Sequence, residues 1–308
     1  MRTDKNGKWT VNGKNVLITG ATSGIGLAAA KELAARGANL GIVARNREKA
    51  NEVAAMLRSA AGGGVTVDVF VADMASQSSI RRAAAEISAK WPRIDVLINN
   101  AGAMYVKRIL TEEGIEMTWA VNHLAPFLLT NLLLDRLKEA GDARIITTAS
   151  HGHKMARKGI DFEDLSAKKR FGALGMLMGG ANLRYGETKL ANVLFTAELG
   201  RRLEGTGVKA ACFDPGLVAT NFNQENGWMA RATMAAMKRF SRSPEQGAET
   251  LVWLADSDGM TERNNGCYYK DKQIAVPSPA ARDSDAARRL WAVSEEQAGT
   301  LHSQANGA

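Results

Sequence analysis

Two residues in the C-terminal half of the chain have types and spacing that suit proton transfer. Tyr185 and Lys189 lie four residues apart near the start of a predicted helix, so their side chains share one face. An ammonium group beside a phenol stabilises the phenolate and lowers its pKa from about 10 towards the working range. Such a phenol can protonate a carbonyl oxygen or deprotonate an alcohol. A pair at this spacing often arises by chance, so taken alone it would more often have a structural role.

Two further polar residues could join this pair. Ser150 ends a predicted buried strand and could contact the same substrate oxygen. Asn122 lies in an otherwise apolar helical run, where a buried amide needs hydrogen-bonding partners. The alternative for Asn122 is a satisfied core residue, and the neighbouring His123 is expected to be a core or surface residue without a catalytic role.

A glycine-rich turn lies directly between the first predicted strand and the first predicted helix. The run Thr19–Gly26 has the spacing Gly-x-x-x-Gly-x-Gly. Glycines there let the backbone turn tightly and approach a pyrophosphate, whose charge is stabilised by the helix N-terminus. The strand–turn–helix context favours a dinucleotide site over a glycine-rich turn without a ligand.

The end of the second predicted strand bears on which dinucleotide binds. An acidic residue at this position would hydrogen-bond the ribose hydroxyls of NAD, but the run Gly41–Arg47 contains no acid. Arg45 could instead bind a 2′-phosphate through its planar guanidinium group. Read with the glycine turn, Arg45 favours NADP(H) over NAD(H); read alone, it would be a solvated surface arginine.

The elements that must position these residues alternate between strands and helices. Short apolar runs predict strands, and helix-period segments between them predict helices, which together indicate a doubly wound, Rossmann-like α/β domain with a parallel sheet. The predicted strands are Asn15–Thr19, Leu40–Val43, Val65–Val71, Val96–Ile98, Arg144–Thr148 and Val208–Phe213. The predicted helices are Gly24–Arg36, Arg47–Ser59, Ser78–Lys90, Glu116–Lys138 and Thr188–Glu204.

Two segments interrupt this alternation. They are rich in Met, Gly or aromatic residues and are expected to be helical lid insertions over a substrate pocket, at about 155–183 and 221–243. The expectation is a single domain over residues 1–308, with a core at 14–270 and a C-terminal tail at 271–308 that contains the weakly amphipathic Asp285–Gln297.

Composition narrows the function classes. The 308 residues carry a net charge of +8, but the basic residues are scattered pairs and aromatics make up only 6%, so no nucleic-acid partner is expected. Cys212 and Cys267 are too few for a disulfide framework, and no cysteine–histidine cluster predicts a metal site. No apolar run is long enough to span a membrane, and the first residues do not resemble a signal peptide, so a cytoplasmic location is expected.

Several of these motifs, in this order, resemble those of the short-chain dehydrogenase/reductase family. The motifs are Thr19–Gly26, Asn99-Asn100-Ala101-Gly102, Asn122, Ser150, Tyr185-Gly-Glu-Thr-Lys189 and Pro215-Gly216. The runs Val121–Thr130, Tyr185–Thr196, Ser243–Ala248 and Gly266–Asp271 are similar to the retinol dehydrogenase-like branch, which also includes WW-domain oxidoreductase-like proteins.

The resemblance implies a seven-stranded sheet of order 3-2-1-4-5-6-7 and a homodimer or homotetramer. It also implies that Tyr185 transfers the proton, Lys189 lowers the pKa of that tyrosine and holds the nicotinamide ribose, Ser150 orients the substrate and Asn122 supports a proton-relay water. Asp73 corresponds to an adenine contact, and Thr220 to a residue near the nicotinamide. The full set of expected cofactor contacts is Gly20, Thr22, Ser23, Gly24, Ile25, Gly26, Arg45, Asp73, Met74, Asn100, Ala101, Gly102, Tyr185, Lys189, Pro215, Gly216, Val218 and Thr220.

Two of the chain's departures from the family pattern lie near the predicted site residues. Asp214 precedes Pro215-Gly216 where His or Ser is more usual, and the segment between Ser150 and Tyr185 is longer than usual around Phe171–Leu183. The expected substrate is a lipophilic or aromatic small-molecule alcohol or carbonyl compound. Two alternatives stay open: reduction of a carbon–carbon double bond, and a catalytically silent NADP(H)-binding regulatory protein.

Overall fold

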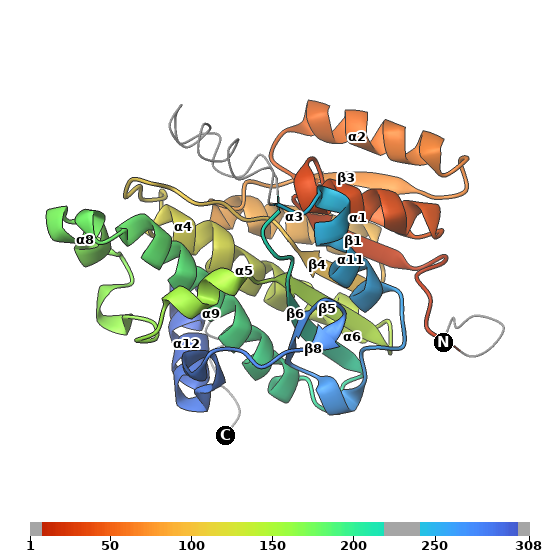
Figure 1. Ribbon diagram of the computed structural model, residues 1–308. Coiled ribbons are helices and arrows are strands. Elements are labelled where there is room, and N and C mark those ends of the chain that lie inside the picture. The colour runs from red at the N-terminus through yellow and green to blue at the C-terminus, as the bar shows by residue number, and fades with distance from the viewer. Residues whose placement is uncertain (1–7, 219–240, 301–308) are drawn as a thin grey trace, which may run out of the picture.

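The computed structural model describes residues 8–218 and 241–300, and within them one eight-stranded sheet forms the centre of the molecule (Figure 1). The strands are β1 (Asn15–Thr19), β2 (Asn39–Ala44), β3 (Val67–Val71), β4 (Val96–Asn99), β5 (Ala143–Thr148), β6 (Val208–Asp214), β7 (Cys267–Lys270) and β8 (Gln273–Ile274). Their spatial order is β3-β2-β1-β4-β5-β6-β7-β8, and every neighbouring pair is parallel except β7 and β8. The doubly wound, Rossmann-like α/β fold is confirmed.

The expected strand number of seven is one too low, because β8 adds a short antiparallel strand beyond β7. The two residues between these strands, Asp271 and Lys272, both have positive φ, at 50° and 64°. Two consecutive left-handed residues suit the tight turn of a hairpin, for which Asn-Gly is the usual sequence. Asp-Lys does not carry that signal, so the sequence did not predict the hairpin.

Helices cover both faces of the sheet. Alternating side chains of β1 pack on opposite sides: Val16 and Ile18 on one, and Leu17 on the other. The first face is covered by α1 (Gly24–Ala35), α2 (Arg47–Ala60) and α11 (Pro244–Ala255). The second face is covered by α3 (Gln77–Lys90), α5 (Ala125–Leu132) and α9 (Gly180–Arg202).

The predicted helix Glu116–Lys138 is divided into four pieces. It consists of α4 (Met117–Trp119), the π-helical turn η1 (Ala120–Leu124), α5, and α6 (Leu134–Lys138). Pro126 accounts for the interruption before it, because its nitrogen cannot donate the hydrogen bond that a continuous α-helix would need. The preceding N–H of Ala125 donates instead to the carbonyl of Ala120, five residues back.

The helix predicted from Thr188 to Glu204 begins eight residues earlier, at Gly180. Between Ser150 and this helix lie η2 (His151–Met155), η3 (Phe162–Asp164), α7 (Lys168–Phe171) and α8 (Ala173–Leu177). The second expected lid, 221–243, falls almost entirely outside the described residues. The helix α12 (Ser284–Gln297) matches the amphipathic segment of the tail and places Trp291 against Phe127 and Phe195.

The segment before β1 is bound to the end of α11 and to the residues that follow this helix. The indole N–H of Trp9 donates to the Ala255 carbonyl at 2.7 Å, and its backbone N–H donates to Asp258 at 2.9 Å. The Lys14 ammonium and the Arg144 guanidinium each lie 4.0 Å from the Trp9 ring centre. Within residues 8–218 and 241–300, no helix combines the length and apolar character that crossing a membrane requires.

Candidate active site

The candidate site lies where the parallel strands end. β1, β4, β5 and β6 finish at Thr19, Asn99, Thr148 and Asp214, and these carboxyl ends share one edge of the sheet. Ligands of open α/β sheets bind in the crevice beyond this edge. Most of the residues singled out from the sequence follow directly on these strand ends.

The glycine turn after β1 closes tightly enough to exclude side chains at two positions. Gly20 has φ +71°, and a Cβ there would lie 3.0 Å from the Ala101 Cα. A Cβ on Gly26 would overlap the Gly20 carbonyl oxygen and lie 2.5 Å from Asn100 Nδ2. The backbone can therefore make the close approach that a pyrophosphate needs only with glycine at these places.

The helix that follows the turn presents backbone donors without an acidic partner. Ser23 is the extended N-cap of α1, its side chain caps no N–H, and the first turn contains no acidic residue. Gly24 and Ile25 are the first residues of this helix, and Thr22 precedes the cap. The unpaired N–H groups and the helix dipole favour an anion here, so the turn fits a dinucleotide phosphate.

Asn100 binds three strand ends together. Its Nδ2 donates to the carbonyls of Thr19 and Gly20, at 3.1 and 3.3 Å, and its Oδ1 accepts from Thr148 Oγ1 at 3.3 Å. Thr19 Oγ1 accepts from the backbone N–H groups of Asn100 and Ala101, both at 3.0 Å. The sequence identified Asn100, but it did not predict that Thr19 and Thr148 would hydrogen-bond to it. The signal that could have identified both threonines was a hydroxyl side chain at the last position of a buried strand.

Lys189 is held deep beneath this edge. The side chain is 4% exposed, and Nζ donates to the Thr148 carbonyl at 2.9 Å. A Cβ on Gly102 would lie 3.7 Å from Nζ and 3.2 Å from Asn122 Oδ1, so Gly102 lies beside both the amine and Asn122. Burial lowers the pKa of Lys189 to about 8.

Tyr185 lies one helical turn before Lys189 and is half-buried. Burial raises the pKa of Tyr185 to about 12, a hydrogen bond with the Ser150 side chain lowers it in part, and the Asp214 carboxylate raises it. Lys189 Nζ lies 5.6 Å from the Tyr185 ring centre, and desolvation of the phenolate is the largest cause of the upward shift in this pKa. Tyr185 is therefore protonated at neutral pH.

Ser150 and Asn122 both lie near Tyr185 and Lys189, but different elements position them. Ser150 follows β5, and its Oγ accepts from the Gly152 N–H at 3.0 Å as well as bonding with Tyr185. Asn122 lies in the π-helical turn and bonds both backbone groups of Ala103 at 2.8 Å. Asn122 Nδ2 also donates to Thr188 Oγ1 at 3.0 Å, next to Lys189. The four residues predicted to be catalytic are therefore neighbours in space.

His123, beside Asn122, belongs to the core. It is fully buried, and Nε2 bonds Ser294 Oγ at 2.7 Å. Burial lowers the pKa of His123 to about 3. The neutral ring packs against Trp119 and Phe195 rather than facing the site.

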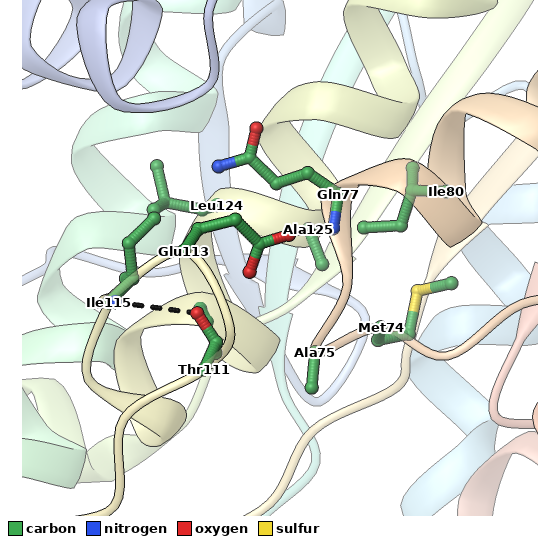
Figure 2. A pocket seen from close by; sticks show the side chains of 10 residues that line it. Met74, Ala75, Gln77, Ile80, Thr111, Glu113, Ile115, Leu124 and Ala125 are labelled. Carbon is green, nitrogen blue, oxygen red and sulfur yellow. Dashed lines mark hydrogen bonds between the residues drawn. The ribbon is translucent and has the colours of Figure 1, made fainter.

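The remaining predicted cofactor contacts line the same edge on either side. Arg45 is exposed directly after β2, and Asp73 follows β3 with Oδ1 accepting from the Ala75 N–H at 2.9 Å. Figure 2 shows a pocket near this end of the sheet that is lined in part by Met74. The four residues predicted to be catalytic, Asn122, Ser150, Tyr185 and Lys189, do not line this pocket. Its lining residues are Met74, Ala75, Gln77, Ile80, Thr111, Glu113, Ile115, Ala120, Leu124 and Ala125.

The residues after β6 form the side of the candidate site opposite Arg45 and Asp73. Gly216, after Pro215, has φ +78°, and its N–H donates to Asp214 Oδ1 at 3.0 Å. Val218 is buried, and a Cβ on Gly247 would lie 2.7 Å from it and 3.2 Å from Ile25, so Val218 packs close to the start of α1. Thr220 lies outside the described residues.

Asp214 is a buried acid that the sequence reasoning set aside. It is 1% exposed, and Oδ2 accepts from the Tyr268 hydroxyl at 3.3 Å and lies 3.8 Å from His151 Nδ1. Burial and the Asp214 charge raise the pKa of Tyr268 well above its ordinary value. The unusual Asp before Pro-Gly was the signal that could have identified it.

A buried ion cluster fixes the start of α9. Arg184 Nε bonds Glu116 Oε2 at 2.8 Å, and its NH1 lies 3.2 Å from Glu187 Oε2. Arg184 also donates to the Leu165 carbonyl, and Arg170 pairs with Glu187 at 2.5 Å. The residue next to Tyr185 is thus anchored directly to two other segments, at Glu116 and Leu165, and through Glu187 to Arg170 of α7. Across residues 8–218 and 241–300, no cluster of His, Cys, Asp or Glu could hold a metal ion.

Comparison with known proteins gives consistent relatives. The family model for short chain dehydrogenase matches residues 14–161. The chain is 39% identical to retinol dehydrogenase 14 of Mus musculus, covering 94% of this chain and 87% of that protein. It is 38% identical to retinol dehydrogenase 13 of Homo sapiens, over 95% of this chain and 86% of that protein.

Solved structures agree with these relatives. An uncharacterised protein from Mycobacterium paratuberculosis superposes with a TM-score of 0.73 at 31% identity, covering 95% of this chain and 96% of that one. A short chain dehydrogenase from Burkholderia cenocepacia in complex with NADP superposes with a TM-score of 0.64 at 25% identity, covering 85% and 97%.

Proposed function

The chain belongs to the short-chain dehydrogenase/reductase family, in its retinol dehydrogenase-like branch, and we propose that it interconverts an alcohol with an aldehyde or ketone using NADP(H). Family membership makes it an oxidoreductase of alcohol and carbonyl groups with a nicotinamide cofactor. The choice of NADP(H) and the use of Tyr185 for proton transfer are our proposals.

One observation carries the catalytic proposal. The Tyr185 hydroxyl bonds Ser150, and one turn further along α9 the Lys189 amine lies beside Gly102 and Asn122. A proton donor, a polar partner for the same oxygen and a cation are thereby placed at the strand edge that also carries the glycine turn. This is the set that reversible carbonyl reduction needs.

Each residue then has a defined task. A nicotinamide cofactor, when bound, would supply or accept the hydride at the carbon atom. Tyr185 donates its proton to the carbonyl oxygen in reduction, and its pKa of about 12 keeps that proton available at neutral pH. Ser150 orients the oxygen, and Lys189 offers positive charge towards the cofactor ribose and the phenol. Asn122 positions the Ala103 backbone and Thr188 around them.

The preference for NADP(H) rests on the exposed Arg45 and on the lack of an acid from Gly41 to Arg47. A guanidinium at this point can bind a 2′-phosphate through charge-assisted hydrogen bonds. We also propose a lipophilic or aromatic substrate, a cytoplasmic location and assembly as a homodimer or homotetramer.

The test follows cofactor absorbance with a panel of aldehydes, ketones and enones, supplying NADPH or NADH. Tyr185→Phe is expected to abolish turnover and leave NADPH binding nearly intact, whereas Lys189→Met is expected to weaken both. Tyr269→Phe is the matched control, because it removes a phenol hydroxyl that bonds the Gly259 carbonyl, at 3.4 Å, and not Ser150.

The outcomes separate the alternatives. Turnover with NADPH on aldehydes or ketones that disappears in Tyr185→Phe would support the proposal. Turnover on enones alone would assign the carbon–carbon double bond. Tight NADPH binding without turnover on any compound would favour a regulatory protein, and a Tyr185→Phe variant that retains most activity would refute the mechanism.

A further inference from the structure

The short helix α8 exposes its apolar side chains to solvent. Leu174, Leu177 and Met178 are 72%, 84% and 67% exposed, and Met176 is 45% exposed. These four residues are called the α8 patch. Helices in globular proteins normally bury their apolar face, and contiguous apolar surface usually marks an interaction site. Figure 1 shows α8 at the periphery of the molecule, beyond the start of α9.

Contacts of the backbone, not of the patch, hold α8 in place. A Cβ on Gly175 would overlap the Lys169 carbonyl, so α7 packs against α8 at this glycine, and a Cβ on Gly180 would overlap the Arg170 carbonyl, so α7 also packs against the start of α9. The Asp164 carboxylate accepts from the N–H groups of Lys168 and Lys169, at 2.9 and 2.8 Å. A helix of five residues is unstable alone, so these contacts hold it while the patch stays outside.

Unpaired positive charge accompanies this apolar projection. Lys154, Arg157, Lys158 and Lys168 are exposed, and none forms an ion pair with any residue in 8–218 or 241–300. Both segments that carry them pack on the same turn of α9, since a Cβ on Gly186 would lie 3.1 Å from the Met155 Cβ and Arg170 pairs with the adjacent Glu187.

The acidic residues that precede α8, from Asp161 to Asp164, already have hydrogen-bonding or ion-pair partners. Asp164 is buried as the cap of α7, Asp161 lies 3.3 Å from Lys169, and Glu163 pairs with Arg289 at 2.6 Å. The surface around the α8 patch is therefore basic as well as apolar. This combination is typical of segments that lie at the interface of an anionic membrane.

We propose that the α8 patch docks this protein peripherally on an anionic lipid bilayer. Leu174, Leu177 and Met178 enter the boundary between headgroups and acyl chains, and the neighbouring lysines and arginine contact the lipid phosphates. A second copy of this chain fits the patch less well: a two-fold contact would bring the same basic residues of both copies together, and like charges repel.

Docking through α8 would also orient the candidate site. Tyr185 lies five residues after Gly180 in α9, which is about 7.5 Å along the helix axis. The side of the molecule that carries Tyr185 would then lie close to the bilayer. This orientation follows from the position of Tyr185 along α9 and does not depend on whether Tyr185 is catalytic. The docking proposal can therefore be tested independently of the catalytic one.

Flotation with vesicles tests the proposal on the full-length protein. Vesicles of phosphatidylcholine with phosphatidylserine are expected to bind the protein, pure phosphatidylcholine vesicles are expected to bind it more weakly, and high salt is expected to release it. The double variant Leu174→Ser/Leu177→Ser is expected to bind the anionic vesicles at least about tenfold more weakly, because both side chains lose their transfer into lipid. Lys168→Glu is expected to weaken binding to anionic vesicles only.

Ile274→Ser/Val276→Ser is the matched control, since those side chains are 59% and 74% exposed on another part of the chain. Unchanged thermal melting of all variants checks folding. Absence of binding to anionic vesicles would overturn the proposal. So would equal loss in the control, or self-association in sedimentation that Leu174→Ser/Leu177→Ser abolishes, which would assign the patch to a second copy.

Discussion

Replacing Arg184 by methionine is expected to destabilise the protein more than any change at a surface arginine. The Arg184 guanidinium is 1% exposed and bonds Glu116, Glu187 and the Leu165 carbonyl. Methionine fills similar volume but leaves two carboxylates, 0% and 2% exposed, without this partner. Removing one member of a buried ion pair costs about 3–5 kcal/mol of unfolding free energy.

The structure places the effect at the lower end of that range. Glu187 keeps Arg170, and Glu116 keeps the N–H donors of Thr118 and Trp119, at 2.9 and 3.1 Å. We therefore expect a loss of about 3 kcal/mol. With an unfolding entropy of about 2.1 cal/mol/K for each of the 308 residues, this loss corresponds to a melting temperature lower by roughly 5 °C.

Thermal and urea melts followed by circular dichroism measure this change. Arg289→Met is the control, because Arg289 and Glu163 are 56% and 79% exposed and a surface pair contributes about 1 kcal/mol or less. If Arg184→Met melted within about 1 °C of the Arg289→Met variant, the burial argument would be refuted.

Three further perturbations test other parts of the reasoning. Gly26→Ala is expected to abolish NADPH binding in a fluorescence titration, because its Cβ overlaps the Gly20 carbonyl, whereas Gly64→Ala, with its nearest neighbour 3.7 Å away, should bind normally. Arg45→Asp is expected to lower the affinity for NADPH by about 10- to 150-fold and to leave the affinity for NADH unchanged. Arg47→Asp is the control. An equal loss of affinity for both cofactors would contradict the contact between Arg45 and the 2′-phosphate. His123 binds a proton in the folded state only near pH 3, whereas the unfolded chain binds one below about 6.5, so stability falls as pH drops through this window. His123→Phe should therefore resist acid better than wild type, and an unchanged acid midpoint in circular dichroism would argue against it.

Local sequence patterns predicted most of the sheet. The strands β1, β5 and β6 begin and end within a residue of their expected positions, because continuous apolar runs are typical of strands buried on both faces. The interrupted helix around Asn122 and Pro126 was not predicted, since its apolar periodicity masks a change of hydrogen-bonding pattern that depends on one missing N–H donor.

The site was predicted by residue type but not by environment. Tyr185, Lys189, Ser150 and Asn122 are neighbours as expected, yet the pKa of Tyr185 moves up instead of down. That direction depends on burial and on Asp214, which approaches from a different strand. Arg184 was likewise missed, because its partners Glu116 and Leu165 come from segments that only the tertiary structure brings beside α9.

The anchoring of Trp9 has a practical consequence for handling the protein. Trp9 contacts Arg144 at the start of β5 and Ala255 at the end of α11, so it lies at the amino ends of the strands. The glycine turn and Tyr185 lie at the carboxyl ends, across the length of the sheet. A label or a reporter domain attached close to Trp9 would therefore lie at the end of the sheet opposite the candidate site. If the protein were immobilised on a surface through this point, the candidate site would face the solution.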